Sequence, residues 1–400
     1  MATADHLMID RRILQEAKSL IAAGHQVTLL AGFECPARES YVLDGIRIER
    51  FVYDWADTRF AKLAVSLLMR PGSKLYSWAW RIFRFSAARV PYVLSSFENF
   101  IFERMLEYQV DILHVHDFPM LAPGLRLAKL RRVPLIYDAH ELYYAQVQLS
   151  ARVQRAYRVK EARLIRHASQ VITVNPYIAK LMAERYEIKL PHVILNASSL
   201  VEIENSQPLR QRFGLSDRHK ILLYQGWISS NRGIERLVEA AEYFDEHVVL
   251  VVIGYGDYEC TLKELVAIKR LENKVFFYGG VPSEQLHALT CDADLGVIPY
   301  HGVDENNYYC SPNKLFEFAI AGLPFICNDL PYLRDVIQRY GNGRIADLGS
   351  PKMIATTVNS VMSNEGVLEE IRAGAMRARL ELNWDVESKK LLDIYASIGA

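Results

Sequence analysis

Short, almost continuous apolar runs alternate along the chain with stretches in which apolar residues recur every three or four positions. In the second half of the chain these runs cover residues 221–226, 248–256, 275–281 and 294–300. Uninterrupted apolar runs of this length are typical of strands in a parallel sheet that is covered by helices on both faces. The pattern therefore predicts an α/β fold of the doubly wound type, in which ligands bind at the carboxyl ends of the strands.

The first half of the chain repeats this rhythm and predicts a second doubly wound domain. Strands are expected at 27–31, 111–116, 134–138, 171–174 and 192–196. The beginning is irregular, because residues 1–10 lead almost directly into the first helix and leave only a short or missing first strand. Since that strand is central in such a sheet, we expect either a short segment that pairs or a less stable domain with unpaired backbone groups.

Two segments of the second half have the composition of a phosphate site. Residues 225–233 (QGWISSNRG) join a strand to a helix and carry one cation, Arg232. Residues 311–324 (SPNKLFEFAIAGLP) open a helix, with Pro312 expected at its first position and Glu317 about one turn further on. Free amides at a helix start can bind phosphate, and Glu317 can accept hydrogen bonds from a sugar or ribose hydroxyl. Taken alone, residues 311–324 are equally consistent with an ordinary capped helix.

The order and spacing of four motifs resemble the donor-binding half of a GT-B glycosyltransferase of the retaining family-4 type (group 1). They are QGxxxxxRG at 225–233, GxG at 254–256, FYGGVP at 277–282 and SPNKLFEFAIAGLP at 311–324. The resemblance extends over almost the whole chain and implies two Rossmann-like domains with an interdomain cleft. The implied domains are an acceptor-side domain, 1–199 completed by 384–400, and a donor-binding domain, 200–383.

The resemblance implies a retaining, metal-independent hexosyltransferase. Such an enzyme moves a hexose-type sugar from a UDP- or GDP-sugar, with UDP favoured, to a glycan or lipid-linked acceptor in cell-surface polysaccharide synthesis. The nucleotide sugar is a substrate, so no cofactor is expected. Catalytic roles fall on His140, next to the transferred sugar, and on Arg232 and Glu317. The implied substrate-binding residues are Gly226, Arg232, Gly254, Tyr278, Val281, Tyr309, Ser311, Pro312, Asn313, Lys314, Leu315 and Glu317.

Departures from the family pattern keep two alternatives open. Tyr309 stands where many relatives carry a glutamate, so a catalytically silent GT-B binding subunit of a polysaccharide assembly complex stays possible, as does a sugar-nucleotide epimerase. A dehydrogenase is disfavoured because the glycine pair at 254–256 lacks a third glycine. Asp292 and Asp294 have the Asp-x-Asp spelling of metal-dependent glycosyltransferases, but they precede an apolar strand where carboxylates cap turns, and no catalytic metal is expected.

The amino-acid composition bears on the partners and the cellular location of the protein. A net charge of zero argues against general nucleic-acid binding. The five cysteines lack metal-binding spacing, which fits a reducing cytosol, and no apolar run is long enough for a spanning helix. Residues 58–90 hold seven basic residues interleaved with aromatics and no acid. This segment suits either an anionic membrane surface, with the protein peripheral on the inner face, or a solvated basic face of a cytoplasmic protein.

Overall fold

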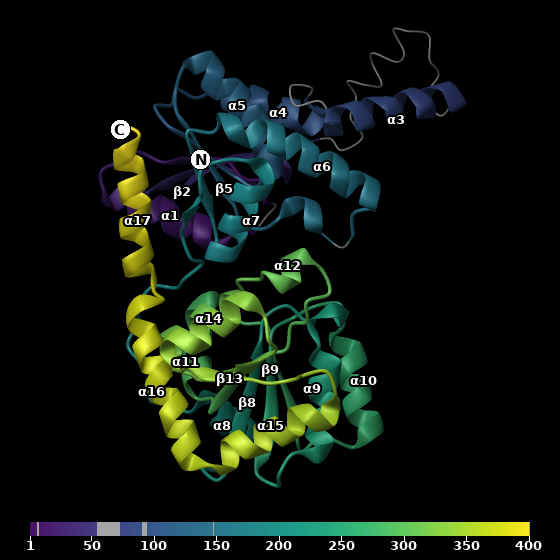
Figure 1. The fold of residues 1–400 in the computed structure, drawn as a ribbon, viewed down its shortest axis with the longest axis vertical. Coiled ribbons are helices and arrows are strands. Elements are labelled where there is room, and N and C mark those ends of the chain that lie inside the picture. Colours follow the sequence, from purple (N-terminus) through teal and green to yellow (C-terminus); the bar gives the residue numbers. More distant parts are fainter. Residues whose placement is uncertain (6–7, 54–72, 90–93, 147, 400) are drawn as a thin grey trace. The chain divides into compact units, whose positions relative to one another are not determined.

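The computed structural model describes residues 1–5, 8–53, 73–89, 94–146 and 148–399. The chain forms two compact units (Figure 1). Unit 1 contains residues 1–194 and 388–400, and unit 2 contains residues 195–387. The boundaries expected from the sequence lie a few residues from these. Both units are α/β structures, and the order of strands and helices in each fits the doubly wound GT-B architecture implied by the motifs.

Unit 1 is built on parallel strands in the order β4 (Leu113–His116), β5 (Leu135–Ala139), β6 (Gln170–Thr173) and β7 (His192–Val193). Helices α5 (Phe118–Arg131), α6 (Ala151–Leu164) and α7 (Pro176–Tyr186) connect these strands. Every residue of β4 and β5 is buried, as expected for strands covered on both faces. The carboxyl ends of β4 and β5 therefore present their next residues at one edge of the sheet.

The first residues of the chain form the short pairing segment that the irregular beginning allowed. Ala2 makes parallel bridges to Leu30 on one side and to Val115 on the other. Its amide donates to His114 O at 3.0 Å, and its carbonyl accepts from the His116 amide at 2.9 Å. The segment thereby joins β4 to the sheet β1 (Thr28–Leu30), β3 (Ile46–Val52), β2 (Glu34–Leu43), and its neighbours are not left unpaired there.

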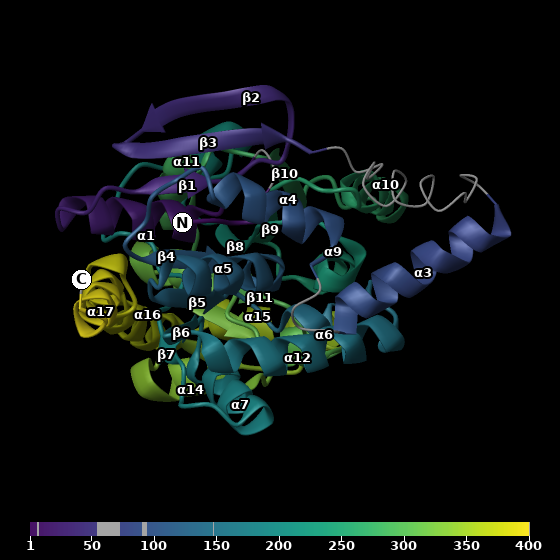
Figure 2. The same ribbon diagram turned by 90° about the horizontal axis from the view of Figure 1, so that it is seen from above.

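The antiparallel pair β2–β3, seen along its length in Figure 2, was not predicted from the sequence. Its turn is Asp44-Gly45, with φ values of 50° and 82°. Two central residues with positive φ are what a two-residue type I′ hairpin requires, and Asp-Gly is a preferred pair there. The dipeptide between two apolar-containing runs was the signal that could have revealed the hairpin.

Four further helices belong wholly or in part to unit 1. Helix α1 (Arg11–Ala22) begins at the N-cap Asp10, whose carboxylate accepts from the Arg12 amide at 2.8 Å. Helix α4 (Ser96–Met105) begins with a capping box between Ser95 and Glu98. Helix α3 (Lys74–Arg89) packs against α6. The final helix α17 (Trp384–Ser397) brings the residues from 388 onward into unit 1, where the Tyr395 hydroxyl lies 3.0 Å from His114 Nδ1.

Unit 2 contains a six-stranded parallel sheet in the order β10 (Val275–Gly279), β9 (Val248–Ile253), β8 (Lys220–Gln225), β11 (Leu295–Ile298), β12 (Phe325–Cys327) and β13 (Gly343–Ile345). Helices α9 (Ile234–Ala240), α10 (Glu259–Lys269) and α15 (Pro351–Ser363) pack in one group. Helices α11 (Ser283–Cys291), α13 (Asn313–Ala321), α14 (Pro331–Tyr340) and α16 (Glu365–Glu381) pack in another. Figure 1 shows the two groups on opposite sides of the strands.

The order of these strands reverses between β8 and β11. Consecutive strands run outward from β8 on one side and outward from β11 on the other. In open α/β sheets the crevice outside the carboxyl ends of the strands at such a switch point is the usual ligand site. The loops after β8 and β11 are therefore where a ligand of unit 2 is expected.

Candidate functional site

Glycines allow the loops after β8 and β9 to approach each other closely. A side-chain carbon on Gly254 would lie 1.9 Å from Gly226 O, and one on Gly256 would lie 2.0 Å from Ile228 O. Gly254 also has a φ of 146°, which side chains rarely tolerate. The glycine pair at 254–256 thus serves backbone packing at the switch point, and it brings the exposed Gly226 to the mouth of the site.

Two predicted cations, Arg232 and Lys314, converge on one aromatic ring. Arg232 Cζ lies 4.5 Å from the ring centroid of Tyr300, and Lys314 Nζ lies 4.8 Å from the same centroid. Lys314 Nζ also lies 4.0 Å from the ring centroid of Tyr224. Tyr224 belongs to β8 and Tyr300 follows β11, so the switch point itself supplies the aromatic faces. Cations over aromatic faces are attracted by the ring quadrupole.

Lys314 is the unusual member of this pair, because its side chain is buried without a hydrogen-bond partner. The residue is 4% exposed, and Nζ has no partner among the described atoms. A side-chain carbon on Gly226 would lie 3.6 Å from this Nζ, which places the amine beside the glycine turn. Burial, reinforced by the positive charge of Arg232, lowers the pKa of Lys314 to about 7. An anion at this point would supply the missing partner.

Glu317 lies one turn further along α13 and is held from the side of the sheet. One of its oxygens accepts from Gln225 Nε2 at 2.6 Å. The amide oxygen of Gln225 in turn accepts from the Thr290 hydroxyl at 2.9 Å. This chain of bonds fixes the carboxylate of Glu317 in a half-buried position, where it can accept hydrogen bonds from hydroxyl groups.

The start of α13 differs by one residue from the expectation. Pro312 is the N-cap, with φ −70° and ψ 136°, and the helix begins at Asn313. The prediction of Pro312 at the first helical position was therefore wrong by one residue, a shift within the usual uncertainty of helix ends. No side chain caps this end, so its first amides keep the anion-binding capacity of a helix start. The exposed Asn313 accepts from Asn196 Nδ2 at 2.7 Å.

The other predicted residues of unit 2 differ in their burial and in the elements that they contact. Tyr309 ends the short helix α12 (Glu305–Tyr308) and, like Ser311, is half-buried in the loop before α13. Leu315 is fully buried in the core. The Tyr278 ring packs 4.2 Å from Arg212 Cζ of helix α8 (Pro208–Phe213), and Val281 is half-buried in the loop after β10. The structure brings together Gly226, Arg232, Lys314 and Glu317, whereas the Tyr278 side chain is directed to α8.

Asp292 and Asp294 have structural partners. An Asp292 oxygen accepts from the amides of Leu209 and Arg210 at 2.7 and 3.0 Å. Asp294 accepts from the Ile221 amide at 2.9 Å and pairs with the Arg210 guanidinium at 2.8 Å. The two carboxylates fasten the start of α8 to the sheet, in agreement with their interpretation as capping groups.

In unit 1, His140 lies at the carboxyl end of β5 between carboxylates. Its Nδ1 is 3.8 Å from Asp10 and 3.7 Å from Asp117, and its Nε2 is 3.5 Å from Asp138. Burial opposes the charged form, but Asp117 and Asp138 raise the pKa of His140 to about 10. The Asp117 carboxylate accepts a hydrogen bond from the His140 amide at 3.0 Å. The backbone of Asp117 has a φ of 62°, a value that is rare outside glycine and is often found at functional sites. His140 is therefore a charged hydrogen-bond donor.

A buried layer of ionisable groups lies behind His140. The Arg12 guanidinium donates to both oxygens of Asp138 at 3.0 Å and lies 3.0 Å from Glu16. Arg12 and Asp138 keep the pKa of each other displaced toward the charged form despite burial. Burial lowers the pKa of His116 to about 4, and its neutral Nδ1 lies 3.2 Å from His140 Nε2. This buried layer fixes the position of His140, and its member Asp138 favours the protonated form of the imidazole.

Four members of this layer carry atoms that metal ions bind. The ligand atoms of Glu16, His114, His116 and Asp138 lie within 4.8 Å of one another, and all four residues are buried. The guanidinium of Arg12 already lies against both carboxylates. Within the described part of the chain, the negative charge of this cluster is thus balanced by an arginine.

Several residues of both units escaped sequence reasoning. Tyr224, Gln225 and Thr290 surround Lys314 and Glu317, and Tyr300 faces both cations. Gln225 and Tyr300 each follow or end a strand at the switch point, and that position was the available signal. Arg12 and Asp138 gave only the sequence signal of a charged residue in an otherwise apolar pattern.

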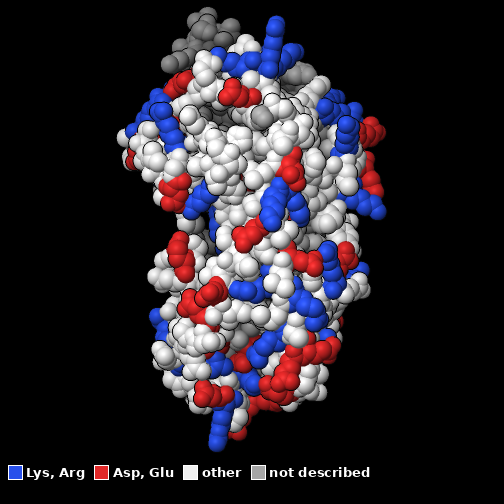
Figure 3. All heavy atoms as spheres, turned by 90° about the vertical axis from the view of Figure 1, so that its left-hand side faces the viewer, with Lys and Arg blue, Asp and Glu red and all other residues white. Residues whose placement is uncertain are grey.

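On the face shown in Figure 3, basic and acidic side chains are interspersed, so this face offers no single-signed surface. None of the helices in the described ranges is both long and apolar enough to cross a membrane. The mixed charges of this face agree with the net charge of zero.

Sequence comparison gives the class of the chain. Residues 9–196 match the family described as glycosyl transferase 4-like domain, and residues 205–378 match glycosyl transferases group 1. An uncharacterised glycosyltransferase of Methanocaldococcus jannaschii is 24% identical over 393 residues, 95% of this chain and 91% of the relative. The alpha-monoglucosyldiacylglycerol synthase of Streptococcus pneumoniae is 26% identical over 65% of this chain and 62% of its own length.

Structural comparison agrees. The crystal structure of Anabaena HepE in complex with UDP and glucose matches 99% of this chain and 98% of its own, with a TM-score of 0.72 and 16% identity. The chain belongs to the group 1 glycosyltransferases, and its fold is GT-B.

Proposed function

We propose that the chain is a retaining, metal-independent hexosyltransferase that uses a nucleotide-diphosphate sugar, with UDP favoured over GDP as the nucleotide. The observation that carries this proposal is the convergence of Arg232 and the buried, unpartnered Lys314 on Tyr300 at the switch point of unit 2. Two cations beside an uncapped helix start suit a diphosphate. The complex of HepE with UDP and glucose supports the choice of UDP.

The positive charges of unit 2 can stabilise the diphosphate as it leaves the sugar. When the bond between the anomeric carbon and the phosphate oxygen breaks, negative charge grows on the leaving group. Arg232, Lys314 and the first amides of α13 stabilise that charge more strongly than the charge of the bound donor, which lowers the barrier. Glu317, fixed by Gln225, binds ribose or sugar hydroxyls. The backbone near Val281 contacts the base.

Retention follows from attack on the face that the leaving group vacates. The acceptor oxygen bonds to the anomeric carbon, and its proton passes to an oxygen of the departing phosphate. A double displacement would need a carboxylate nucleophile paired with an acid. Glu317 is instead tied to Gln225 and adjoins the cations of the diphosphate site. His140, charged and held by three carboxylates, donates a hydrogen bond to a hydroxyl of the transferred sugar.

The acceptor is proposed to be a glycan or a lipid-linked molecule in cell-surface polysaccharide synthesis. Helix α3 supports the lipid-linked choice. Its residues Leu75, Trp78 and Ile82 are 56%, 61% and 44% exposed and recur at helical spacing on one face. Lys74 and Arg81 are exposed beside this stripe. An apolar stripe bordered by cations suits an anionic membrane interface, so the protein would be cytoplasmic and peripheral. Residues 58–72 and 90 of the basic segment lie outside the described residues.

The two alternative functions, a silent binding subunit and a sugar-nucleotide epimerase, predict other reaction products than a transferase does. A silent binding subunit binds the nucleotide sugar without consuming it, and an epimerase changes the sugar without releasing the nucleotide. The test is incubation with a panel of UDP- and GDP-sugars in EDTA, scored for release of nucleoside diphosphate and for the configuration of the released sugar. A transferase slowly hydrolyses its own donor and first releases the retained anomer. Release of the inverted anomer, or no release from any donor, contradicts the proposal.

A further inference from the structure

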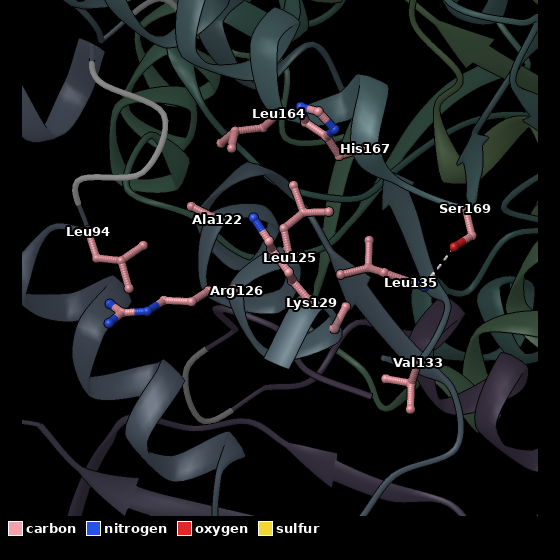
Figure 4. Close-up of a pocket in the computed structure, with 11 residues that line it drawn as sticks. Leu94, Ala122, Leu125, Arg126, Lys129, Val133, Leu135, Leu164, His167 and Ser169 are labelled. Atoms are coloured by element: carbon pink, nitrogen blue, oxygen red, sulfur yellow. Dashed lines mark hydrogen bonds between the residues drawn. The ribbon is translucent and has the colours of Figure 1, made fainter. Parts of the chain in front are cut away.

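A cavity lies in unit 1, at the edge of the sheet opposite to His140. Its volume is about 550 Å³. Leu135, the first residue of β5, and Ser169, just before β6, lie in its wall and are joined by a hydrogen bond of 3.1 Å (Figure 4). His140 follows the other end of β5. The cavity is therefore separate from the groups assigned to sugar transfer.

Most of the cavity wall is apolar. Leu94, Leu125, Val133 and Leu164 line it together with Leu135 (Figure 4). The volume lies within the range of small-molecule sites, and such sites are mostly apolar with a few placed polar groups. A glycan would leave its hydroxyls unpaired against these walls. No Phe, Tyr or Trp lines the described cavity for a nucleobase to stack on.

Apart from Ser169, whose hydroxyl accepts from the Leu135 amide, the polar side chains of the cavity are basic. Arg126 and Lys129 of α5 and His167 after α6 line it, and no acidic residue does. Throughout the described ranges, no carboxylate forms an ion pair with Arg126, Lys129 or His167. The guanidinium group of Arg126 packs over the ring of Phe102, with its Cζ 4.5 Å from the ring centroid. In a chain with no net charge, Arg126 and Lys129 beside one apolar cavity, without a carboxylate ion-pair partner in the described ranges, form a local excess of positive charge.

We infer that this cavity binds a single-chain amphiphile with an anionic head group, its chain against the leucines and its phosphate or carboxylate against Arg126 and Lys129. Both halves of the cavity are needed for this ligand, since the apolar wall selects a hydrocarbon chain and the basic rim selects the charge. Among the described residues that line the cavity, none belongs to α3, and the cavity would take one molecule without a bilayer.

The probe is dodecyl phosphate, titrated calorimetrically into the full chain below its micelle concentration. We expect one molecule per chain. Shortening the chain to octyl phosphate should weaken binding by about fourfold per methylene removed, and inorganic phosphate alone should not bind. A neutral dodecyl glycoside should bind at least about tenfold more weakly, the scale of losing a charge-assisted hydrogen bond.

Two variants test the assignment to this cavity. The double substitution Arg126→Gln and Lys129→Gln should weaken dodecyl phosphate binding by about tenfold or more. The matched control, Arg155→Gln with Arg158→Gln, removes two exposed cations from α6 outside the cavity and should leave binding unchanged. Leu125→Gln, which alters only the apolar wall, should also weaken binding. Thermal melting checks that each variant is folded.

Three results would overturn the inference: no saturable binding of dodecyl phosphate, equal binding of the neutral glycoside, or equal losses in the cavity variant and its control. Equal losses would mean nonspecific attraction by surface charge.

Discussion

At the scale of single residues, we expect the proposed donor site of unit 2 to lower the stability of the fold. Lys314 is buried over two tyrosine rings without a hydrogen-bond partner, while Arg232 adds a second positive charge nearby. Buried polar groups are normally paired, and exceptions of this kind concentrate at binding sites. The motif residues could be predicted from sequence, but the contacts that Gln225 and Tyr300 make with them could not, because these contacts depend on strand order and register.

Arg232→Gln removes one of the two charges that face the leaving diphosphate. We expect kcat/KM for the nucleotide sugar to fall by roughly 100-fold or more, because one preorganised charge partner in a transition state has about this value. Steady-state kinetics measure the effect. The control is Arg218→Gln, an exposed arginine of the same unit, which should retain wild-type kinetics. Equal activity of the two variants would remove Arg232 from the site.

Lys314→Met should separate stability from function. The folded-state pKa of Lys314 is about 7, below its usual value of 10.5, so the charged amine destabilises the fold below pH 7. Methionine removes this penalty, and we expect the free energy of unfolding at pH 6 to rise by about 1–3 kcal/mol. The gain should shrink as the pH rises from 7 toward 10, since wild type then loses the buried charge. Donor turnover should fall.

Denaturant unfolding at several pH values measures this gain in stability. A destabilised Lys314→Met variant, or a gain that grows with pH, would mean that Lys314 is a satisfied structural residue.

At the scale of elements, glycine turns determine where the strand ends can meet. Gly254→Ala would place a methyl group 1.9 Å from Gly226 O. We expect the free energy of unfolding of unit 2 to fall by about 3 kcal/mol or more. Gly214→Ala is the control, because Gly214 also has positive φ, 64°, but open space around it, and it should cost about 1 kcal/mol. Equal costs from denaturant unfolding would show that conformation alone requires glycine there.

Helix α3 gives a second test at this scale. Trp78→Ser should lower co-sedimentation with anionic liposomes several-fold, since it removes the largest exposed apolar group of the stripe. Added salt should release the wild-type protein, because it screens attraction between surface charges. Ile268→Ser on α10 removes an even more exposed apolar side chain elsewhere and should change nothing. Equal binding to neutral and anionic liposomes would return α3 to the interpretation as a solvated basic face.

The elements also show where sequence patterns succeed. Strands β8, β9, β10 and β11 of unit 2 were predicted because each lies in a continuous apolar run bounded by turns, whereas the three-residue strands β12 and β13 were not predicted. The β2–β3 hairpin was missed because its residues are mixed in polarity, and the information lay in Asp44-Gly45 alone. The first strand was expected to be short or missing, and three residues suffice to pair it because Ala2 bridges strands on both sides.

At the scale of the whole molecule, each unit holds its own set of charges, and we propose that the two sets serve different parts of one reaction. Unit 2 concentrates positive charge at the switch point of its sheet, while unit 1 surrounds a charged His140 with carboxylates. Family motifs predicted the first set almost completely. The buried layer of Arg12, Glu16 and Asp138 was not predicted, because it assembles residues from elements more than 100 positions apart in the sequence.

The central claim is that unpaired cations of unit 2 hold a diphosphate. The most direct test is calorimetric titration of the full chain with UDP and with UMP in EDTA. We predict that UDP binds at least about tenfold more tightly, since the second phosphate gains a charge-assisted contact, and that Arg232→Gln removes most of this difference. Equal affinities for UDP and UMP in the wild-type chain, or a preference for UDP that appears only with added divalent metal, would contradict the account.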